Sequence, residues 1–495
     1  MANKYYSTIG LEIHAELKTQ TKMFCGCKNN PDEEKPNVNI CPICMAHPGA
    51  LPVINKQAIE NVIKVGLAVG GKIANFSEFD RKNYFYPDIP KGYQISQYKY
   101  PIVSGGHLVD FDITRVHLEE DTANNKHRER FFPEVGLRGN SPKSDFGGEG
   151  YSLIDFNRAG VPLMELVTEP HTFRETEETA KKAVKFAKEL QLILWYLDVS
   201  EANMEKGEMR VEANISISAD PKILGTKVEV KNLNSFRSVE RAVKYEIERM
   251  TKLLDEGKGR EIVQETRGWN EGKQKTFSQR KKEGSADYRY LPDPDLQKLK
   301  LHEAFNLEKM EKELPELPAE KRARYKNDFG IKDEDIESYV NDPELGLWFE
   351  EVAKILNKKD SIKILSNYLT SDYLGFKKNN QDIKLPSPKN FAELIGLVIE
   401  NKISSRATKD IFAMILIKDE SPLKIATEKK LLQSNDEGEL KIIVEKIISE
   451  NPEIVAIYKA GKENVMMSLV GKIIKESNGS ANPQIVIKLL KEMLK

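Results

Sequence analysis

The sequence predicts an α+β protein, in which an N-terminal domain built on a large, mostly antiparallel sheet with covering helices is followed by all-α domains. The first observation is that residues 1–293 contain short segments in which apolar and polar residues alternate, the pattern of half-buried strands. The second is that the chain from residue 294 onward is rich in Lys, Glu and Leu and has helical periodicity. The third is length, because 495 residues exceed one ordinary core and indicate roughly two to four domains.

Three domain ranges follow from this change in composition and from pairs of prolines. Proline pairs that favour turns or boundaries lie at 291–295, 313–318 and 385–388. We therefore expect the sheet domain at 1–293, a helical linker domain at 294–388 and a helical tail domain at 389–495.

Composition and the N-terminal segment exclude several classes of protein. The formal net charge is −1, so no global field attracts nucleic acid, and any RNA contact must come from local patches. No apolar run reaches the roughly 18 residues of a membrane span, and the segment MANKYYSTIG lacks the apolar core of a signal peptide. We expect a cytoplasmic protein without membrane contact. The P-loop and dinucleotide-binding motifs are absent from the sequence as well.

Two segments of the N-terminal part have the periodicity of amphipathic helices. The first runs from about Thr172 to Leu197 and carries Ala, Val and Leu side chains at helical spacing. The second is expected to begin near Ser235, which suits an N-cap, and its apolar positions run from Val239 to Leu254. We expect both helices to cover the sheet.

The segment IGLEIHAEL (9–17) alternates strictly between apolar and polar residues. One strand face is apolar, and the other carries Glu12, His14 and Glu16. Such a polar face is either simply solvated, as in many antiparallel sheets, or the floor of a metal or acid–base site. This segment alone leaves both interpretations open.

Four further segments have the same mixed polar character: RVHLEED (115–121), LIDFNRAGVPLMELV (153–167), MRVEANISI (209–217) and KVEVKNLNS (227–235). In the first of these, Arg115, His117 and Glu119 share one strand face. Solvated faces favour Lys, Glu and Thr, whereas these segments are rich in Asn, His and Arg, which favours a polar cavity. Acids with one imidazole suit Mg²⁺, and nearby Lys or Arg would neutralise a transferring phosphoryl group.

The segment FDRKNYFYPDIPKGYQISQY (79–98) interleaves cations with aromatic residues. Arg81, Lys82 and Lys91 lie among its tyrosines and phenylalanines. Such a segment can stack on a nucleobase and hold phosphates. A β-hairpin whose aromatic residues belong to a core is an equally good interpretation of the sequence.

The four cysteines form two tight pairs, Cys25 with Cys27 and Cys41 with Cys44. When a loop over 25–44 brings the pairs together, four thiolates suit one tetrahedral, structural zinc ion. Two disulfides are the alternative, but they fit poorly in a chain without a secretion signal. His47 could replace one thiolate, although a histidine so placed is more often outside the ligand set.

A series of long motifs runs along the chain in one order: GLEIHAEL, CPICMAHPGALPVIN, FDRKNYFYPDIPKGYQISQY, HLEEDTAN, DFNRAGVPLMELVTEP, VEVKNLNSFRSVERAVKYEIERM, QETRGWNE and DYRYLPDPDL. Together they resemble the B subunit of the aspartyl/glutamyl-tRNA amidotransferase family, over nearly the whole chain. The final part, including residues 454–494, is similar to the tail domain of that subunit and to free-standing YqeY-like proteins.

The resemblance implies a reaction and an assembly. Such a subunit works with an amidase-type A subunit and a small C subunit on tRNA mischarged with glutamate or aspartate. In its N-terminal cradle domain, ATP and Mg²⁺ activate the side-chain carboxylate as an acyl phosphate. Ammonia that the A subunit releases from glutamine then gives Gln-tRNA(Gln) or Asn-tRNA(Asn). Zinc, in the members that carry it, supports the fold rather than the chemistry.

The resemblance also assigns roles to single residues. The residues that match catalytic, Mg²⁺-holding positions are Glu12, His14, Glu119, Glu120 and Glu165. The residues that match positions at the nucleotide or acceptor end, or that line the same cavity, are Lys82, Tyr84, Asp155, Arg158, Lys231 and Asn232. The zinc positions match Cys25, Cys27, Cys41 and Cys44. One departure is Glu212, where many members have aspartate, so the resemblance assigns it no contact.

Two other functions stay open. The chain could be a non-catalytic scaffold that binds tRNA while another subunit performs all the chemistry. The predicted acidic cluster argues against a pure RNA surface, because phosphates repel carboxylates that no cation bridges. The chain could also be a tRNA-independent carboxylate amidase, but a small-molecule enzyme has little use for the long helical C-terminal part.

Overall fold

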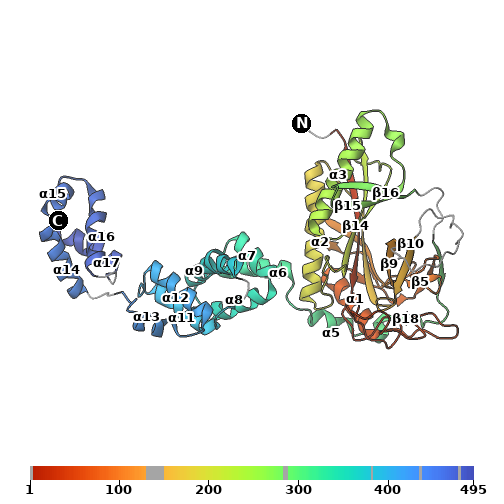
Figure 1. The fold of residues 1–495 in the computed structure, drawn as a ribbon, viewed down its shortest axis with the longest axis horizontal. Coiled ribbons are helices and arrows are strands. Elements are labelled where there is room, and N and C mark those ends of the chain that lie inside the picture. Colours follow the sequence, from red (N-terminus) through yellow and green to blue (C-terminus); the bar gives the residue numbers. More distant parts are fainter. Residues whose placement is uncertain are drawn as a thin grey trace, which may run out of the picture. The chain divides into compact units, whose positions relative to one another are not determined.

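The computed structural model describes residues 4–129, 150–281, 288–380, 383–433, 437–477 and 481–494. The chain divides into two compact units, Met1–Pro318 and Ala319–Lys495. The first unit contains a large sheet with helices, and the described part of the second is built of helices (Figure 1). This arrangement confirms the predicted α+β class. The three domain ranges expected from composition stay predictions.

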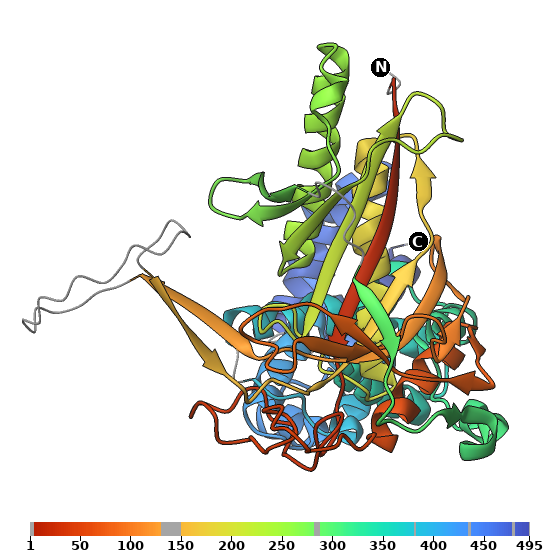
Figure 2. The same cartoon turned by 90° about the vertical axis from the view of Figure 1, so that its right-hand side faces the viewer.

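An eleven-stranded sheet dominates the first unit. Its strands are β1 (Tyr6–Glu16), β2 (Lys72–Ile73), β6 (Val103–Ser104), β7 (His107–Leu108), β8 (Phe111–Glu120), β11 (Pro162–Thr168), β12 (His171–Phe173), β13 (Met209–Ser218), β14 (Val228–Leu233), β15 (Glu265–Asn270) and β16 (Lys275–Lys281). Their order is β16-β15-β14-β13-β1-β11-β8-β6-β2, while β12 pairs with β1 and β7 with β8. Only the β14–β15 pairing among the described strands is parallel, which confirms a mostly antiparallel sheet. Figure 2 shows β1, in red, running through the sheet.

Smaller sheets surround this one. β4 (Asp80–Asn83), β5 (Tyr93–Ser96) and β17 (Arg289–Pro292) form a three-stranded sheet, β9 (Asn124–Glu129) pairs with β10 (Gly150–Asp155), and β3 (Phe76–Ser77) pairs with β18 (Leu299–Lys300). The predicted segment 79–98 is therefore a β-hairpin. Phe79 belongs to the core, but Phe85 is 91% exposed and Tyr98 57% exposed, so the interpretation of its aromatic residues as core holds only in part.

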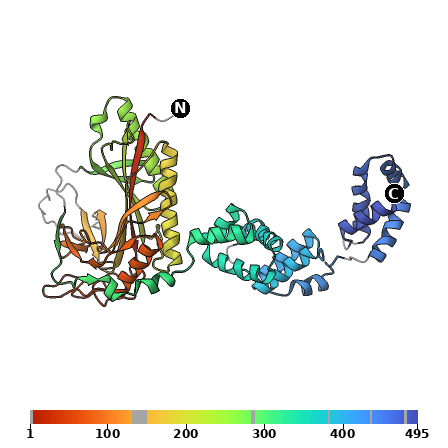
Figure 3. The same ribbon diagram turned by 180° about the vertical axis from the view of Figure 1, so that it is seen from behind.

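Helices cover one face of the main sheet. α2 (Thr176–Tyr196) and α3 (Phe236–Asp255) lie side by side against it (Figures 1 and 3), and α1 (Lys56–Ala68) packs on β8. Leu11 and Ile13 of β1 are buried in the core that these helices share. Both predicted helices are present, although the first begins at Thr176 rather than at about Thr172, because residues 171–173 form β12. The Ser235 hydroxyl caps α3 by accepting a 3.0 Å hydrogen bond from the Ser238 backbone N–H. Three short helices complete the unit: the 3₁₀ helix η1 (Gly259–Glu261), α4 (Leu301–Ala304) and α5 (Leu307–Lys312).

The regular secondary structure of the second unit's described residues is helical, and Ile403 and Leu432 form an isolated β-bridge between loops. Its helices are α6 (Pro318–Arg324), η2 (Tyr325–Phe329), α7 (Asp333–Val340), α8 (Pro343–Leu356), α9 (Lys359–Asn367), η3 (Tyr368–Tyr373), α10 (Leu374–Asn379), α11 (Pro388–Ile399), α12 (Ser405–Ile417), α13 (Pro422–Glu428), α14 (Glu437–Glu450), α15 (Pro452–Lys459), η4 (Glu463–Val465), α16 (Met466–Glu476) and α17 (Pro483–Met493). α14, α16 and α17 bury a core of their own around Val444, Leu469 and Leu490. Among the described residues, the structure has no helix that is both long and apolar enough to cross a membrane.

Candidate functional site

A row of polar side chains crosses four neighbouring strands of the main sheet. In the strand pairing, His14 on β1 lies opposite Arg210 on β13 and Glu165 on β11. Glu165 in turn lies opposite His117 on β8. Side chains alternate between the faces of a strand, so this row faces away from the helix-covered core. The polar face of β1 therefore belongs to a continuous surface made by strands that are distant in sequence.

His14 lies at the centre of a group of carboxylates. Its Nε2 atom is 3.5 Å from Glu165 Oε2, 3.6 Å from Glu119 Oε1 and 3.8 Å from Glu12 Oε1. Glu165 Oε2 is also 3.1 Å from Nε2 of His117. Two sets of possible ligand atoms, each within 4.8 Å of one another, share Glu165: Glu12, His14 and Glu165, and His117, Glu119 and Glu165. Oxygen atoms with an imidazole nitrogen in this arrangement suit a divalent cation such as Mg²⁺.

The charges of this carboxylate–imidazole cluster are strongly coupled. Burial, followed by the charges of Glu165 and Glu212, raises the pKa of Glu12 to about 7. Burial opposes a charged His14, but hydrogen bonding to Glu165 and its charge outweigh burial and raise the imidazole pKa to about 9. Burial alone would raise the pKa of Glu165, but His117 and His14 outweigh burial and hold this pKa well below the usual range. Positive charge is thus stabilised among these carboxylates, the property that a cation site requires.

A second acidic group continues from the cluster onto β13 and β14. Glu212 lies opposite Glu12, and Glu229 adds a third carboxylate within 4.8 Å. The Nζ atom of Lys231 is 2.7 Å from Glu212 Oε2 and 3.3 Å from Glu229 Oε1. Burial opposes the ammonium charge, but Glu212 and Glu229 outweigh it and raise the pKa of Lys231. Glu212, the departure from the family pattern, is therefore an ion-pair partner of Lys231, whereas the neighbouring Asn232 is exposed.

Lys82 and Tyr84 come from the hairpin that contains β4. Burial opposes the charge of Lys82, but the field of nearby carboxylates, Glu119 foremost and Glu165 among them, outweighs burial and raises its pKa. Burial and then Glu119 also raise the pKa of the Tyr84 hydroxyl. The Lys82 Nζ atom lies 5.1 Å from the centre of the Tyr288 ring. A lysine beside a cation site can offset the charge of a phosphoryl group held there.

Glu120 stands apart from the cluster, although it was expected there. Consecutive strand residues point to opposite faces, and Glu119 accepts a 3.2 Å hydrogen bond from the Ser96 hydroxyl on the cluster side. Glu120 instead accepts a 2.9 Å hydrogen bond from the Ile95 backbone N–H and pairs with Lys91. Glu120 and Lys91 line a cavity of about 340 Å³ that borders the cysteine loop.

Arg158 lies in a network around Asp121. The Asp121 Oδ2 atom is 2.8 Å from Nη2 of Arg210 and 3.5 Å from Nε of Arg158. Burial would raise the pKa of Asp121, but the two arginines outweigh burial and lower it. Arg158 also donates to the Thr122 carbonyl oxygen at 3.1 Å. This network borders the polar row through Arg210, which lies opposite His14.

Two residues of the site were not among the predicted ligands. His117 shares a strand face with Glu119, so the alternation in RVHLEED already contained the signal for it. Glu229 reaches the acidic group because β14 pairs with β13, with Asn214 opposite Glu229. No local sequence pattern carries that information, since strand pairing is a long-range property.

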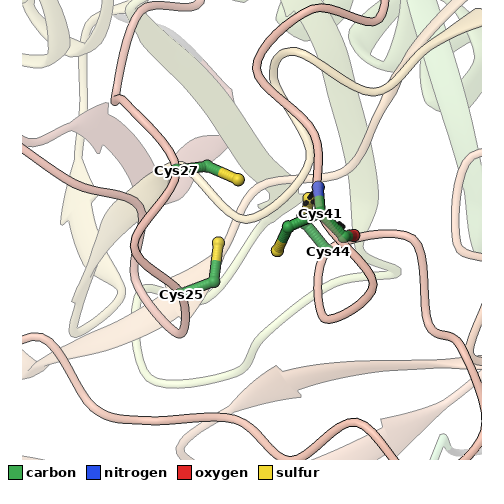
Figure 4. A group of neighbouring side chains, drawn as sticks. All are labelled: Cys25, Cys27, Cys41 and Cys44. Carbon is green, nitrogen blue, oxygen red and sulfur yellow. Dashed lines mark hydrogen bonds between the residues drawn. The ribbon is translucent and has the colours of Figure 1, made fainter.

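The four cysteines gather between two segments of one loop, as Figure 4 shows for Cys25 with Cys27 and Cys41 with Cys44. Their Sγ atoms all lie within 4.8 Å of one another, and all four are free thiols. The Cys41 backbone N–H donates to Cys44 Sγ at 3.1 Å. Hydrogen bonding to Cys25, the largest effect, lowers the pKa of Cys44 to about 5. This geometry fits a tetrahedral four-cysteine metal site better than two disulfides.

The fold and the site define an α+β domain with a carboxylate–imidazole cluster on an antiparallel sheet and a four-cysteine loop, continued by helices. Residues 7–306 match the family model described as the GatB/GatE catalytic domain, and residues 347–494 match the one described as the GatB domain. The chain belongs to the GatB family, as its motifs predicted.

Similar proteins cover nearly the whole chain. A relative from Rippkaea orientalis is 40% identical over 510 residues, which span 99% of this chain and 98% of the relative. A relative from Persephonella marina is 40% identical over 505 residues, with coverage of 99% and 100%. One from Thermotoga maritima is 41% identical over 504 residues, with coverage of 99% for both. Each is named as the B subunit of aspartyl/glutamyl-tRNA(Asn/Gln) amidotransferase.

Proposed function

We propose that this chain is the component of a tRNA-dependent amidotransferase that activates and amidates the side-chain carboxylate of Glu-tRNA(Gln), Asp-tRNA(Asn) or both. ATP is the phosphoryl donor. The observation that carries the proposal is the convergence of Glu12, Glu119 and Glu165 on His14, beside Lys82, in a chain of the GatB family. The names of the relatives support the same reaction.

The proposed reaction uses both the negative charges of the carboxylates and the positive charge of Lys82. A carboxylate is a poor acyl electrophile, so one of its oxygens first takes the terminal phosphoryl group of ATP and becomes part of a good leaving group. The carboxylates would hold Mg²⁺ together with His14, which must give up its proton to bind a metal. The ion would supply positive charge against the transferring phosphoryl group. Lys82 would hold phosphate oxygens from the hairpin side. Ammonia then attacks the acyl carbon, the C–N bond forms and phosphate leaves.

A partner protein supplies the ammonia in this proposal. The sequence contains no evident Ser-His-Asp order or reactive-cysteine signature, and its four cysteines are gathered in one cluster. We therefore infer a cytoplasmic complex with an amidase-type A subunit, which hydrolyses glutamine, and a small C subunit. Separate binding of glutamine and tRNA on different subunits requires that ammonia pass between them.

Zinc has a structural role in this proposal. Cys25, Cys27, Cys41 and Cys44 would hold one Zn²⁺ with all four positions filled by protein, which leaves no open position for a substrate. Elemental analysis of the purified protein should find one zinc ion per chain. Protein without zinc and with four titratable thiols would contradict this assignment.

Reconstitution with the A and C subunits tests the catalytic proposal. His14→Ala and Glu119→Ala are assembled separately, and glutamine hydrolysis, tRNA-dependent ATP hydrolysis and amide formation are measured as three rates. Loss of a preorganised charged group should lower ATP hydrolysis and amide formation on the order of 10²–10³-fold. The rate of glutamine hydrolysis should fall less than the other two rates, because the partner subunit performs that reaction.

The matched control is Glu169→Ala, which removes an exposed carboxylate next to β11 and outside the cluster. It should keep all three rates. Undiminished ATP hydrolysis and amide formation in both cluster variants would instead favour the scaffold that only binds tRNA.

A further inference from the structure

Lys22 is a buried lysine at the base of the cysteine loop. Its side chain is fully buried, and its Nζ atom donates to the carbonyl oxygens of Asn39, at 2.8 Å, and Phe156, at 2.9 Å. Among the residues that the structure describes, no carboxylate forms an ion pair with it. A buried ammonium held only by neutral carbonyls is costly unless a negative charge lies nearby.

Lys22 also adjoins the cysteine cluster. The Lys22 backbone N–H donates to the Cys27 carbonyl oxygen at 2.9 Å. A Cβ atom built on Gly160 would lie 3.7 Å from Lys22 Cδ and 3.9 Å from Cys44 Cβ, so these two side chains border the same glycine.

The two interpretations of the cysteines differ in charge. Four thiolates around one Zn²⁺ leave a formal charge of two minus, which a buried ammonium can partly neutralise. Two disulfides are neutral and would leave Lys22 buried without compensation. We propose that Lys22 is the internal counter-ion of a tetrathiolate metal centre formed by Cys25, Cys27, Cys41 and Cys44. This inference rests on the zinc site proposed above. It adds a residue whose charge stabilises the bound metal although the residue is not a ligand.

The contacts around Lys22 also show what the centre holds in place. Asn157 accepts hydrogen bonds of 2.9 Å from the backbone N–H groups of Val38 and Asn39. The backbone N–H of Asn37 donates to Asp155 at 3.0 Å. With the Lys22 bond to Phe156, these contacts fasten the loop between the cysteine pairs to the segment that follows β10. Arg158, one of the predicted cavity residues, lies in the same segment.

The test compares zinc retention among three variants of the full chain. Lys22→Gln removes the charge, Lys22→Arg keeps it, and Lys28→Gln is the matched control, because Lys28 is an exposed lysine next to Cys27. Zinc release to a colorimetric chelator is followed over time. Lys22→Gln should lose zinc about 10- to 100-fold faster than the wild type, the usual effect of a residue behind the ligands. Lys22→Arg should restore much of the retention, and Lys28→Gln should match the wild type.

A second measurement uses the wild-type chain and does not depend on the folding of a variant. Acylation of lysines is mapped by mass spectrometry before and after zinc is removed. With zinc bound, Lys22 should be protected from acylation. After zinc is removed, Lys22 should become acylated at the same stage at which the cysteine thiols become reactive. Equal zinc release from Lys22→Gln and the wild type, or Lys22 labelling unchanged by zinc removal, would overturn the inference while the zinc site stands. A wild-type chain that binds no zinc would overturn the zinc proposal itself.

Discussion

Single residues in this site owe their ionisation to their neighbours, and His117, which the sequence placed on the polar strand face but not among the ligands, contributes to this effect. Its side chain is 2% exposed, and its Nε2 lies 3.1 Å from Glu165, the carboxylate shared by the two possible ligand sets. Its Nδ1 atom has no hydrogen-bond partner among the described residues. His117 therefore acts on Glu165 through one nitrogen and helps to keep that carboxylate charged.

The first residue-scale prediction concerns His117. Replacement by Ala should lower amide formation about 10- to 100-fold, the usual range for a residue that orients a ligand group. Replacement by Gln should restore part of the rate, because its side-chain amide can donate from nearly the same position. The reconstituted complex gives the measurement, and glutamine hydrolysis should not change. Equal rates for the Ala variant and the wild type would show that Glu165 needs no such partner.

The second residue-scale prediction concerns Glu350 on α8. Burial would raise its pKa, but hydrogen bonds from Arg324 and Tyr325 outweigh burial and lower it. The folded-state pKa is thus below the ordinary value of about 4.3, so the ion pairs stabilise fully above that value. The stabilisation is lost as the pH falls through the lower folded-state pKa. Glu350→Gln should cost about 1–2 kcal/mol at neutral pH and progressively less below about pH 4.

Hydrogen exchange of α8 in variant and wild type, compared at each pH, measures this difference. Glu351→Gln, on the exposed side of the same helix, is the control and should change protection little at any pH. A difference that stays constant from neutral to acidic pH would contradict the assignment of a lowered pKa to Glu350.

At the scale of elements, short-range hydrogen bonds decide where several helices begin. Asn55 caps α1 by accepting from the backbone N–H groups of Gln57 and Ala58, and Ser404 caps α12 in the same way at Ala407. Ser235 at the start of α3 was predicted from sequence because serine suits the N-cap and an apolar stripe follows it. These features are local, which is why helix boundaries in this chain are readable before strand pairing is known.

The element-scale prediction concerns that cap. Ser235→Ala should lower the free energy of unfolding by about 1 kcal/mol, because the first turn of α3 loses a hydrogen-bond acceptor. Ser235→Asp should restore the stability, since its carboxylate accepts the same bond and favours the positive helix N-terminus. Chemical denaturation of the three chains measures the difference. An alanine variant as stable as the wild type would mean that solvent replaces the cap without cost.

At the scale of the whole molecule, the sheet unit carries the candidate chemistry and the helical unit carries none of the predicted ligands. Within the helical unit, the Phe391 ring of α11 contacts Trp348 of α8, with ring centres 5.1 Å apart. A truncation at the predicted boundary of 389 would remove Phe391 and expose Trp348. α14, α16 and α17 bury their own core, so a truncation after residue 433 is the cleaner experiment.

The whole-molecule prediction uses that truncation. Complexes with the chain shortened after residue 433 should keep glutamine hydrolysis and bind tRNA severalfold more weakly, because a helical appendage positions the RNA backbone rather than the reacting atoms. Higher salt should weaken the binding of the intact complex more steeply than that of the shortened one, since phosphate contacts release counterions. Equal affinity and equal salt dependence of the two complexes would exclude a tRNA contact by the tail.

The sequence by itself determined which residues share a strand face, where the two covering helices run and that the cysteines form two pairs. Each of these follows from a short-range rule: a period of two in strands, a period of 3.6 in helices, and ligand spacing in a metal loop. Family motifs added the identity of the reaction.

Only the tertiary structure decided which faces meet. β1 pairs with β13 and β11, and β11 with β8, so Glu12, His14, Glu165 and Glu119 converge from three separate segments. The tertiary structure also pairs Glu120 with Lys91 and buries Lys22. The physical reason is that neighbouring residues fix how side chains alternate between the two faces of a strand. Strand order and the burial of a charge are instead fixed by packing between residues far apart in the chain.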